Sequence, residues 1–273
     1  MATGTFGASR RAATAGATPL LALLADAIKR RPLDHYRSES PCATMPTMSD
    51  APTRIVLASQ SPRRRRLLSW LELPFEPHAV DTPEDLDSPL AADPPALAIA
   101  LAAEKAEAAR AEGLYDDALL LCFDTVVVHD GAVLGKPTDE ADAWRMLRSL
   151  SGRTHQVVTG VALLCPGEDA PRTFSVTTDV EMAELTDCSI AAWMAMGTYL
   201  GCAGAYNIEA QVASVGDSEC FQNVAGLPLC HLYLELLGIS GECSPGTPAS
   251  PVGACDAALS RHCRLADALG TRR

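Results

Sequence analysis

The sequence predicts an α/β domain built on a mixed β-sheet flanked by helices. Three observations lead to this fold class. Short apolar runs of strand length alternate with longer segments of helical periodicity. Several helical segments begin at capping residues and end at glycine. His-Asp-Gly at residues 129–131 separates two apolar runs, as in an antiparallel hairpin, so the sheet is not purely parallel.

Composition and charge restrict the class of protein. The chain has 273 residues, of which 48% are hydrophobic and 21% charged, values typical of a soluble globular protein with a substantial core. The formal net charge of -12 argues against a general nucleic-acid or membrane binder. No segment has the apolar length of a membrane span. We therefore expect a cytoplasmic protein in which a local basic site attracts any polyanionic substrate.

The chain divides by composition into three parts. Residues 1–51 are rich in Ala, Thr, Ser and Arg, and we expect a low-complexity, disordered extension. This extension is either a transit-type presequence or the result of a translation start placed too far upstream, since Met45 and Met48 lie near its end. Residues 52–239 form the working domain. Residues 240–273 are predicted to be a linker rich in Pro, Gly and Ser, followed by a tail with a terminal helix.

The ten cysteines are scattered and predict no disulfide framework. Cys243, Cys255, His262 and Cys263 follow one another without the two-residue spacing of a compact zinc site. Reduced thiols in a cytosolic protein are therefore the expectation.

The first elements of the domain are a strand and two helices. Residues 54–58 form a short apolar run typical of a buried strand. A helix begins at Pro62, with Ser61 as its N-cap, and continues to about Leu71. The Ala-rich segment 94–113 predicts a long helix that ends at its glycine.

The remaining elements alternate in the same way. We predict a helix over residues 138–152, with Thr138 as a possible cap and Ser151-Gly152 as its end. Further helices are predicted at 186–200 and 227–238. The predicted strands are 118–123, 125–129, 132–135, 155–164 and 173–185.

Four consecutive arginines follow Pro62 in a chain that is acidic overall. A helix N-terminus presents unpaired backbone N–H groups that bind anions. Ser59 adds a hydroxyl, and Arg63 and Arg64 add planar forks suited to phosphate oxygens. The alternative is a solvated run of charge, which is the expectation for Arg65 and Arg66.

Asp124 lies between two apolar runs. A carboxylate so placed is costly unless it is hydrogen-bonded, meets a metal or lies in a cleft. We interpret it as a general base or a ligand of a divalent cation, with a turn or capping aspartate as the alternative.

Two lysines complete the candidate site. Lys105 follows Leu97 and Leu101 at four-residue spacing, so it lies on the apolar stripe of its helix. Either its stem reaches to solvent or its ammonium points into a cleft. Lys136 lies in Gly-Ala-Val-Leu-Gly-Lys-Pro-Thr, which departs from a phosphate-binding P-loop in glycine spacing and in the proline after the lysine.

Seven motifs in order resemble the Maf family of nucleoside triphosphate pyrophosphatases. They are LASQSPRR, AAEKA, FDTVV, LGKP, ADAWRMLRSLSGRTHQVVTGVAL, CAGAYNIE and NVAGLPL, and the resemblance runs from Ile55 to Leu237. It implies a mixed-sheet fold related to the inosine triphosphate pyrophosphatases, often dimeric. It also implies hydrolysis of a nucleoside triphosphate to the monophosphate and pyrophosphate, with a divalent cation (Mg, Mn or Co).

The resemblance also assigns roles to residues. It implies that Asp124 is the proton acceptor, and that Ser59, Arg64, Lys105 and Lys136 surround the phosphates. The family often has an Asp-Glu pair where this chain has Asp81 and Thr82. Glu84 is the candidate to replace the missing acid, so Asp81 and Glu84 are the predicted metal ligands.

Three positions separate family branches by base preference, namely Arg63, Thr125 and Glu209. Arg63 and Thr125 resemble the branch that acts on dTTP and UTP, whereas Glu209 resembles the branch that acts on 7-methyl-GTP. A carboxylate accepts from the two N–H donors of a guanine edge, whereas thymine and uracil present one donor between two acceptors.

The predicted function is therefore a pyrophosphatase that removes dTTP, UTP or a modified nucleotide from the pool, acting as a homodimer and binding neither nucleic acid nor membrane. A 7-methyl-GTP pyrophosphatase is the first alternative. The alternative of another class is a non-catalytic, nucleotide-binding regulator of cell division.

Overall fold

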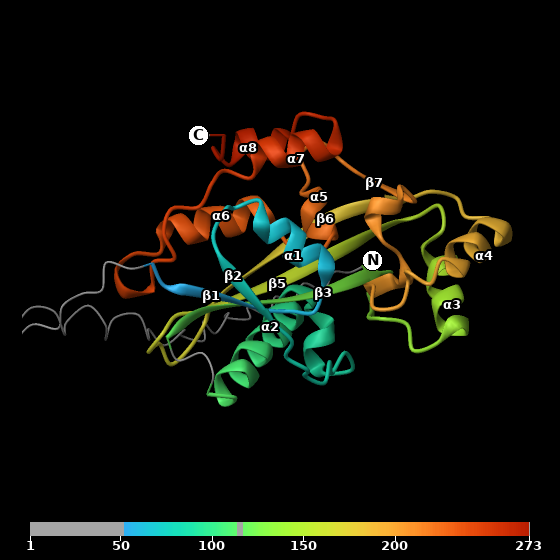
Figure 1. Ribbon diagram of the computed structural model, residues 1–273. Coiled ribbons are helices and arrows are strands. Elements are labelled where there is room, and N and C mark those ends of the chain that lie inside the picture. Colours follow the sequence, from blue (N-terminus) through green and yellow to red (C-terminus); the bar gives the residue numbers. More distant parts are fainter. Residues whose placement is uncertain (1–51, 114–116, 273) are drawn as a thin grey trace, which may run out of the picture. The chain divides into compact units, whose positions relative to one another are not determined.

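The protein is built on one seven-stranded mixed sheet (Figure 1). The computed structural model describes residues 52–113 and 117–272. The strand order is β2-β1-β3-β5-β6-β7, with β4 paired to β3. Strands β1, β2 and β3 run parallel, and the other pairs are antiparallel. The strands are β1 (Arg54–Ala58), β2 (Phe75–His78), β3 (Ala118–His129), β4 (Ala132–Leu134), β5 (Thr154–Leu164), β6 (Arg172–Met182) and β7 (Ala213–Val215).

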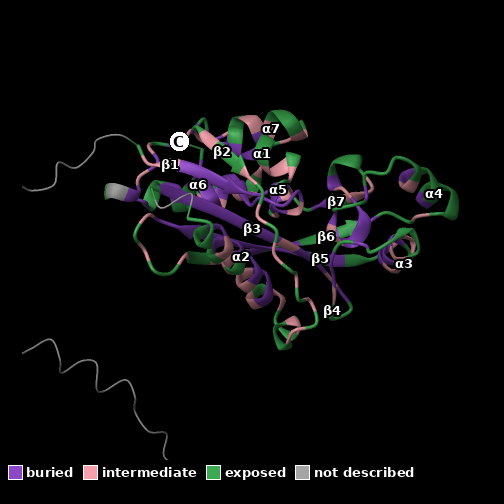
Figure 2. Ribbon diagram, turned by 60° about the horizontal axis from the view of Figure 1, so that its bottom comes forward, coloured by how far each residue is buried: buried purple, intermediate pink, exposed green. Residues whose placement is uncertain are grey.

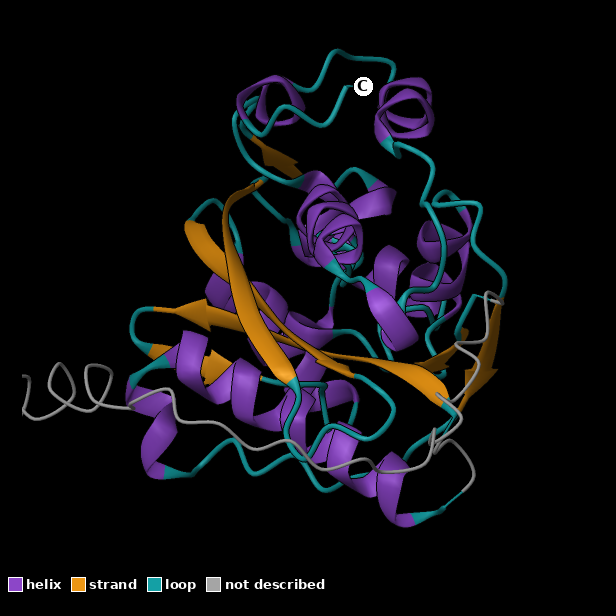
Figure 3. Cartoon of the chain, turned by 90° about the vertical axis from the view of Figure 1, so that its left-hand side faces the viewer, coloured by secondary structure: helices purple, strands orange, loops and turns teal. Residues whose placement is uncertain are grey.

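Helices cover both faces of the sheet, which confirms the predicted fold class (Figure 3). The α-helices are α1 (Pro62–Ser69), α2 (Pro94–Ala111), α3 (Glu140–Leu150), α4 (Asp187–Ala195), α5 (Phe221–Val224), α6 (Leu229–Gly238), α7 (Val252–Leu259) and α8 (Arg264–Ala268). Short 3-10 helices are η1 (Pro89–Ala92), η2 (Ala203–Ala205), η3 (Ile208–Ala210) and η4 (Gly241–Cys243). In the described residues no helix combines the length and apolar character needed to cross a membrane.

Alternation along the strands sorts side chains between two cores. On β1, Ile55 and Leu57 face α1, α3 and α6, whereas Val56 and Ala58 face α2. Successive strand residues point to opposite faces, so this division continues along β3. Strands β1, β3 and β5 are largely buried, and the outer sides of the helices are exposed (Figure 2). The small alanines of α2 let that helix lie close to the sheet.

The most consequential difference from the sequence prediction lies in β3. The two predicted strands 118–123 and 125–129 are one continuous strand that passes through Asp124. On one side, β1 pairs with β3 only as far as Ala58 opposite Cys122. The chain then leaves the sheet to form α1, so the side of β3 beyond Cys122 is open there. Asp124 therefore lies inside a strand, beside the end of its parallel neighbour.

Local predictions were right at several turns and caps. The hairpin forms with Asp130 and Gly131 at positive φ (50° and 76°), as its Asp-Gly sequence indicates. Ser61 caps α1, with Pro62 in its first turn. For α3 the prediction was wrong by one residue, because Asp139 rather than Thr138 is the N-cap. Strands β2 and β7 were not predicted, because both are short and carry few apolar residues.

The C-terminal segment 240–272 packs onto the domain, so it is not the separate linker and tail that its composition suggested. The Ser244 carbonyl accepts from the Thr53 N–H at 2.8 Å, and the Leu71 carbonyl accepts from the Ala249 N–H at 2.8 Å. Cys230, Val252 and Ala266 form a small core where α6, α7 and α8 meet. Two short helices stand where one terminal helix was expected.

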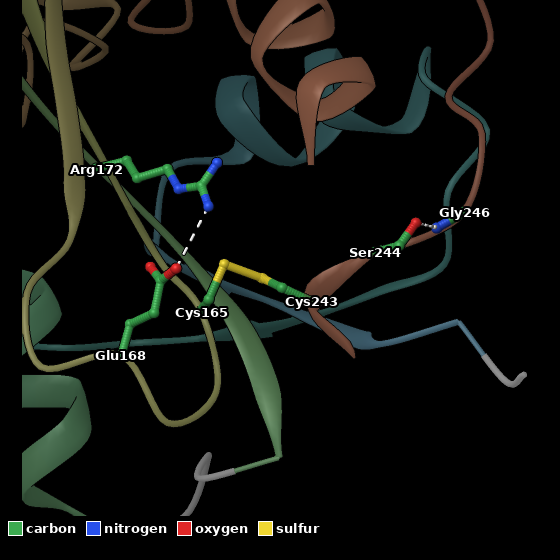
Figure 4. The surroundings of a disulfide bond; sticks show 6 residues. All are labelled: Cys165, Glu168, Arg172, Cys243, Ser244 and Gly246. Carbon is green, nitrogen blue, oxygen red and sulfur yellow. Dashed lines mark hydrogen bonds and ion pairs between the residues drawn. A yellow bond between two sulfur atoms is a disulfide. The ribbon is translucent and has the colours of Figure 1, made fainter. Parts of the chain in front are cut away.

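One disulfide, Cys165–Cys243, joins the end of β5 to η4 (Figure 4). This corrects the expectation of reduced thiols throughout. The partners are 78 residues apart in sequence, so no local spacing signals the bond, yet the fold brings their Cα atoms to 5.5 Å. The other cysteines in the described residues are free, and no group of three or more His, Cys, Asp or Glu side chains there could hold a metal.

Removing this disulfide is expected to destabilise the fold. Closing a loop of this length raises the free energy of unfolding by about 4 kcal/mol on a chain-entropy estimate, and this stability is lost with the bond. The C165A/C243A double variant should show this loss in urea denaturation, as should the wild type in reductant. C188A, which removes an exposed free thiol, is the matched control. Identical wild-type midpoints with and without reductant would contradict the bond.

Candidate active site

A cavity of about 420 Å³ opens where β1 ends and α1 begins. It collects all but one of the residues that the sequence marked as functional. They come from the β1–α1 turn, the first turn of α1, the segment after β2, helix α2, strand β3 and the β4–α3 loop. The predicted residues that line it are Ser59, Arg63, Arg64, Asp81, Glu84, Lys105, Asp124, Thr125 and Lys136. Glu209 is not among its lining residues.

The turn into α1 is organised by two serines. The Ser61 hydroxyl accepts from the Arg64 backbone N–H at 3.4 Å, which caps the helix. The Ser59 hydroxyl accepts from the Ser61 N–H at 3.2 Å and from Arg64 Nη1 at 3.3 Å. Ser59 therefore links the loop backbone to the arginine side chain, beside the phosphate-binding helix terminus that the sequence predicted.

Arg64 is held by the protein on three of its nitrogens. Nε donates to the Gly226 carbonyl at 2.8 Å, Nη1 to Ser59 Oγ, and Nη2 to Thr125 Oγ1 at 3.0 Å. Its guanidinium lies 5.7 Å from the centre of the Phe123 ring. Burial lowers the pKa of Arg64, and the nearby Asp124 charge opposes that shift. A guanidinium has five N–H groups, so two remain for an anion in the cavity.

The pleat of β3 sends Asp124 and Thr125 to opposite faces of the sheet. Thr125 faces α1 and Arg64, whereas Asp124 faces α2, where Lys105 meets its Oδ1. Lys105 is 9% exposed on the buried stripe of α2, as the sequence predicted, and its ammonium reaches the cleft. Asp124 is 3% exposed, and its Oδ2 has no hydrogen-bond partner within the described structure.

Glu84 bridges the two lysines. Its Oε1 accepts from Lys136 Nζ at 2.6 Å and from Lys105 Nζ at 3.2 Å. Partial burial alone raises the pKa of Glu84, but the hydrogen bonds and charges of Lys136 and Lys105 outweigh it, so the pKa lies below its usual value. The result is a row of alternating charge, Lys136–Glu84–Lys105–Asp124, across the cavity.

The sequence profile described as Maf-like protein matches residues 54–238, which cover the sheet, α1 to α6 and this cavity. The chain belongs to the Maf family. A dTTP/UTP pyrophosphatase of Porphyromonas gingivalis strain ATCC 33277 is 45% identical over 188 residues, covering 67% of this chain and 92% of that protein. A dTTP/UTP pyrophosphatase of Geobacter metallireducens is 41% identical over 189 residues, covering 67% and 95%.

Among solved structures, the Ham1 protein of Staphylococcus aureus overlaps with a TM-score of 0.34 at 17% sequence identity. The overlap covers 48% of this chain and 72% of that one. A likeness of this size supports no conclusion about this Maf chain's fold or activity.

The acidic residues of this Maf chain fit a metal that arrives with a nucleotide. Magnesium commonly takes one or two carboxylates, with phosphate oxygens and waters completing its shell. The carboxylates of Glu84 and Asp81, which both line the cavity, supply this number of ligands. Asp81 lies exposed at the cavity wall, and Thr82 beside it brings no charge. The described residues offer no all-protein cage.

Glu209 forms an ion pair with a residue outside the cavity. Its carboxylate pairs with Arg66, on the exposed side of α1. Arg66 and Arg65 are both exposed, as predicted, but Arg66 is paired rather than merely solvated. The pair ties α1 to η3, in the segment whose Cys202, Ala203 and Tyr206 line the cavity. In the described structure, Glu209 therefore contacts helix α1 beside the cavity and does not line the cavity itself.

Charge reversal tests whether Glu209 acts through Arg66. We expect Arg66→Glu and Glu209→Arg each to lower kcat/KM about threefold, the size typical of an exposed ion pair. The double variant R66E/E209R should recover most of this loss without changing the order of preferred nucleotides. Arg65→Glu, at the exposed neighbouring position, is the control. A base preference that changes in Glu209→Gln alone would return Glu209 to the role of base reader.

Sequence reasoning missed four residues that shape the site. The Tyr206 hydroxyl lies 2.7 Å from His155 Nε2 under the cavity, and burial lowers the pKa of His155 to about 4, so the pair is neutral. Gly226, at φ 97°, leaves room for Arg64, and its carbonyl accepts from Arg64 Nε. Thr159 lies behind Thr125. Their motifs were noticed, but nothing in a linear pattern shows which members face the cavity.

Proposed function

We propose that this Maf protein is a nucleoside triphosphate pyrophosphatase that hydrolyses dTTP and UTP and so removes them from the nucleotide pool. The observation that carries the chemistry is Asp124. It is a buried carboxylate with one oxygen bound by Lys105 and the other unpartnered, in a cavity lined by four cationic side chains. The named activity of relatives at 41 to 45% identity supports the substrate.

Asp124 acts as the general base. A water held at its Oδ2 gives up a proton to the carboxylate as the water oxygen bonds to the α-phosphorus. The bond between that phosphorus and the oxygen bridging to the β-phosphate breaks, and pyrophosphate leaves with the electron pair. Lys105 keeps Oδ1 occupied, so the carboxylate cannot rotate freely and Oδ2 stays directed at the water.

The cations bind the phosphates and stabilise the charge that grows on pyrophosphate. Arg64 offers its two remaining N–H groups as a fork, and Arg63 lies beside it at the start of α1. Lys136, whose side chain is 52% exposed, reaches the phosphates at the cavity mouth. A divalent cation (Mg, Mn or Co), held by Glu84 and Asp81 at the cavity wall, would add Lewis-acid stabilisation when bound.

The pairing of Glu209 with Arg66 favours pyrimidines over 7-methyl-GTP. A carboxylate must face the cavity to accept from a guanine edge, and Glu209 does not line it. Arg63 and Thr125 do line it, and we propose them as contacts of the nucleotide. The second candidate, a 7-methyl-GTP pyrophosphatase, depends on Glu209 leaving Arg66.

A panel of triphosphates tests the proposal. Purified protein is incubated with dTTP, UTP, CTP, GTP and 7-methyl-GTP in Mg, Mn or Co, and pyrophosphate release is measured. We expect dTTP and UTP to be the best substrates. Release from none of them would leave the non-catalytic regulator, and 7-methyl-GTP as the best substrate would favour the second candidate. We further propose a cytoplasmic homodimer, which sedimentation and cell fractionation check.

A further inference from the structure

Thr159 is a buried polar residue outside the machinery described so far. It is 0% exposed on β5, directly opposite Thr125 of β3 in the strand register. The two hydroxyl oxygens are 2.9 Å apart, and Thr159 Oγ1 donates to the Asn223 carbonyl at 3.1 Å. It therefore connects the cavity wall to the turn that leads to Gly226.

Counting the hydroxyl protons gives the direction of this series of hydrogen bonds. A threonine hydroxyl has one proton, and a carbonyl only accepts. Since Thr159 gives its proton to Asn223, the proton between the two threonines must come from Thr125. Arg64 Nη2 can only donate, so Thr125 accepts from it. Each hydrogen bond is thus donated in one direction, from Arg64 to Thr125, from Thr125 to Thr159, and from Thr159 to the Asn223 carbonyl.

Thr125 can therefore act only as a hydrogen-bond acceptor toward the cavity. Its proton points away, one lone pair is taken by Arg64, and one lone pair remains. Its half-buried side chain lines the cavity, so that lone pair is the hydroxyl's only way to hydrogen-bond a ligand. A phosphate oxygen, which carries no proton, gains nothing there. A hydrogen-bond donor of the nucleotide does.

We propose that Thr159 is a specificity-determining positioning residue, which makes Thr125 an acceptor-only contact for a hydrogen-bond donor of the nucleotide. This rests on the proposed function. In UTP and dTTP the donors are the base N3–H and the sugar hydroxyls. Cytosine carries an unprotonated, accepting N3 in the same place, so a contact of Thr125 with the base N3–H selects uracil and thymine over cytosine.

Thr159→Val isolates the effect. Valine keeps the shape and removes the hydroxyl, so Thr125 regains a proton that it can direct into the cavity. The Asn223 carbonyl stays paired, because it also accepts from the Gly226 N–H at 2.9 Å. Thr159→Ser retains the hydroxyl and is the matched control. Thr125→Val, which removes the same contact from the cavity side, is the second variant should Thr159→Val fold poorly.

The experiment measures Kd for α,β-methylene analogues of UTP, CTP and 2′,3′-dideoxy-UTP, which needs no turnover. We expect the preference for UTP over CTP to fall about tenfold in Thr159→Val and Thr125→Val, and to persist in Thr159→Ser. If only the preference for UTP over 2′,3′-dideoxy-UTP falls, the donor is a sugar hydroxyl. Unchanged ratios in both variants would overturn the inference. Absent pyrophosphate release from wild type would overturn only the proposed catalysis.

Discussion

Replacing Asp124 by Asn should lower kcat for pyrophosphate release by about 10²- to 10⁴-fold, the range over which a positioned general base acts. The amide keeps the size of the side chain, and its oxygen still accepts from Lys105, but the second position can no longer take a proton. Single-turnover assays with UTP measure the loss. Nucleotide affinity should remain measurable, because Arg63, Arg64 and Lys136 are untouched.

The control for this prediction is Asp87→Asn, at an exposed acid of the same loop region as Glu84 that does not line the cavity. It makes the same chemical change and removes the same charge, and it should leave kcat within about twofold. Full turnover in Asp124→Asn would remove the residue from catalysis. Equal losses in both variants would show a general charge effect.

The sequence predicted well what local chemistry dictates. The Ser-Pro start of α1, the Asp-Gly hairpin and the apolar stripe that carries Lys105 each depend on neighbours within a few residues. The sequence also predicted Asp124 and Lys105 in one site, although they are 19 residues apart. A lysine on a buried helix stripe and an aspartate in a buried strand both need a partner, and here each is the other's partner.

What the sequence could not predict is set by contacts between distant segments. Cys165 and Cys243 meet only because residues 240–272 return to the domain. Glu209 was interpreted from its position in a motif, yet its nearest cation, Arg66, lies 143 residues earlier. Composition marked the C-terminal segment as linker, because the few apolar residues that anchor it are spread thinly along it. Each outcome depends on three-dimensional proximity that has no linear signal.

Thr125 and Asp124 show how far pleating matters to the site. They are neighbours on one strand, so their side chains point to opposite faces of the sheet. Both still reach the cavity, because β1 ends two residues before the position opposite Asp124. Arg64 thus stands on one side of the sheet, and Asp124 with Lys105 stands on the other. The distance of α2 from the sheet therefore controls the position of Lys105.

Gly160 sets that distance, and Gly160→Ala should cause a large loss of stability. It pairs with Asp124 in the register. A methyl group there would lie 2.0 Å from the Ala98 carbonyl oxygen and 2.5 Å from the Ile99 nitrogen, both backbone atoms of α2. Backbone cannot rotate away as a side chain does, so the helix must move. Overpacking of this kind costs about 3 kcal/mol.

The displaced helix would also carry Lys105 away from Asp124, so Gly160→Ala should lower kcat in the fraction that remains folded. Gly253→Ala is the matched control, because a methyl group at that position in α7 meets no atom within 4 Å. It should stabilise by about 0.5 kcal/mol as helical glycine becomes alanine. Urea denaturation and steady-state kinetics on both variants measure the two effects. A Gly160→Ala protein with wild-type stability and kcat would show that α2 can retreat without moving Lys105, and would break the link drawn between the packing of this helix and catalysis.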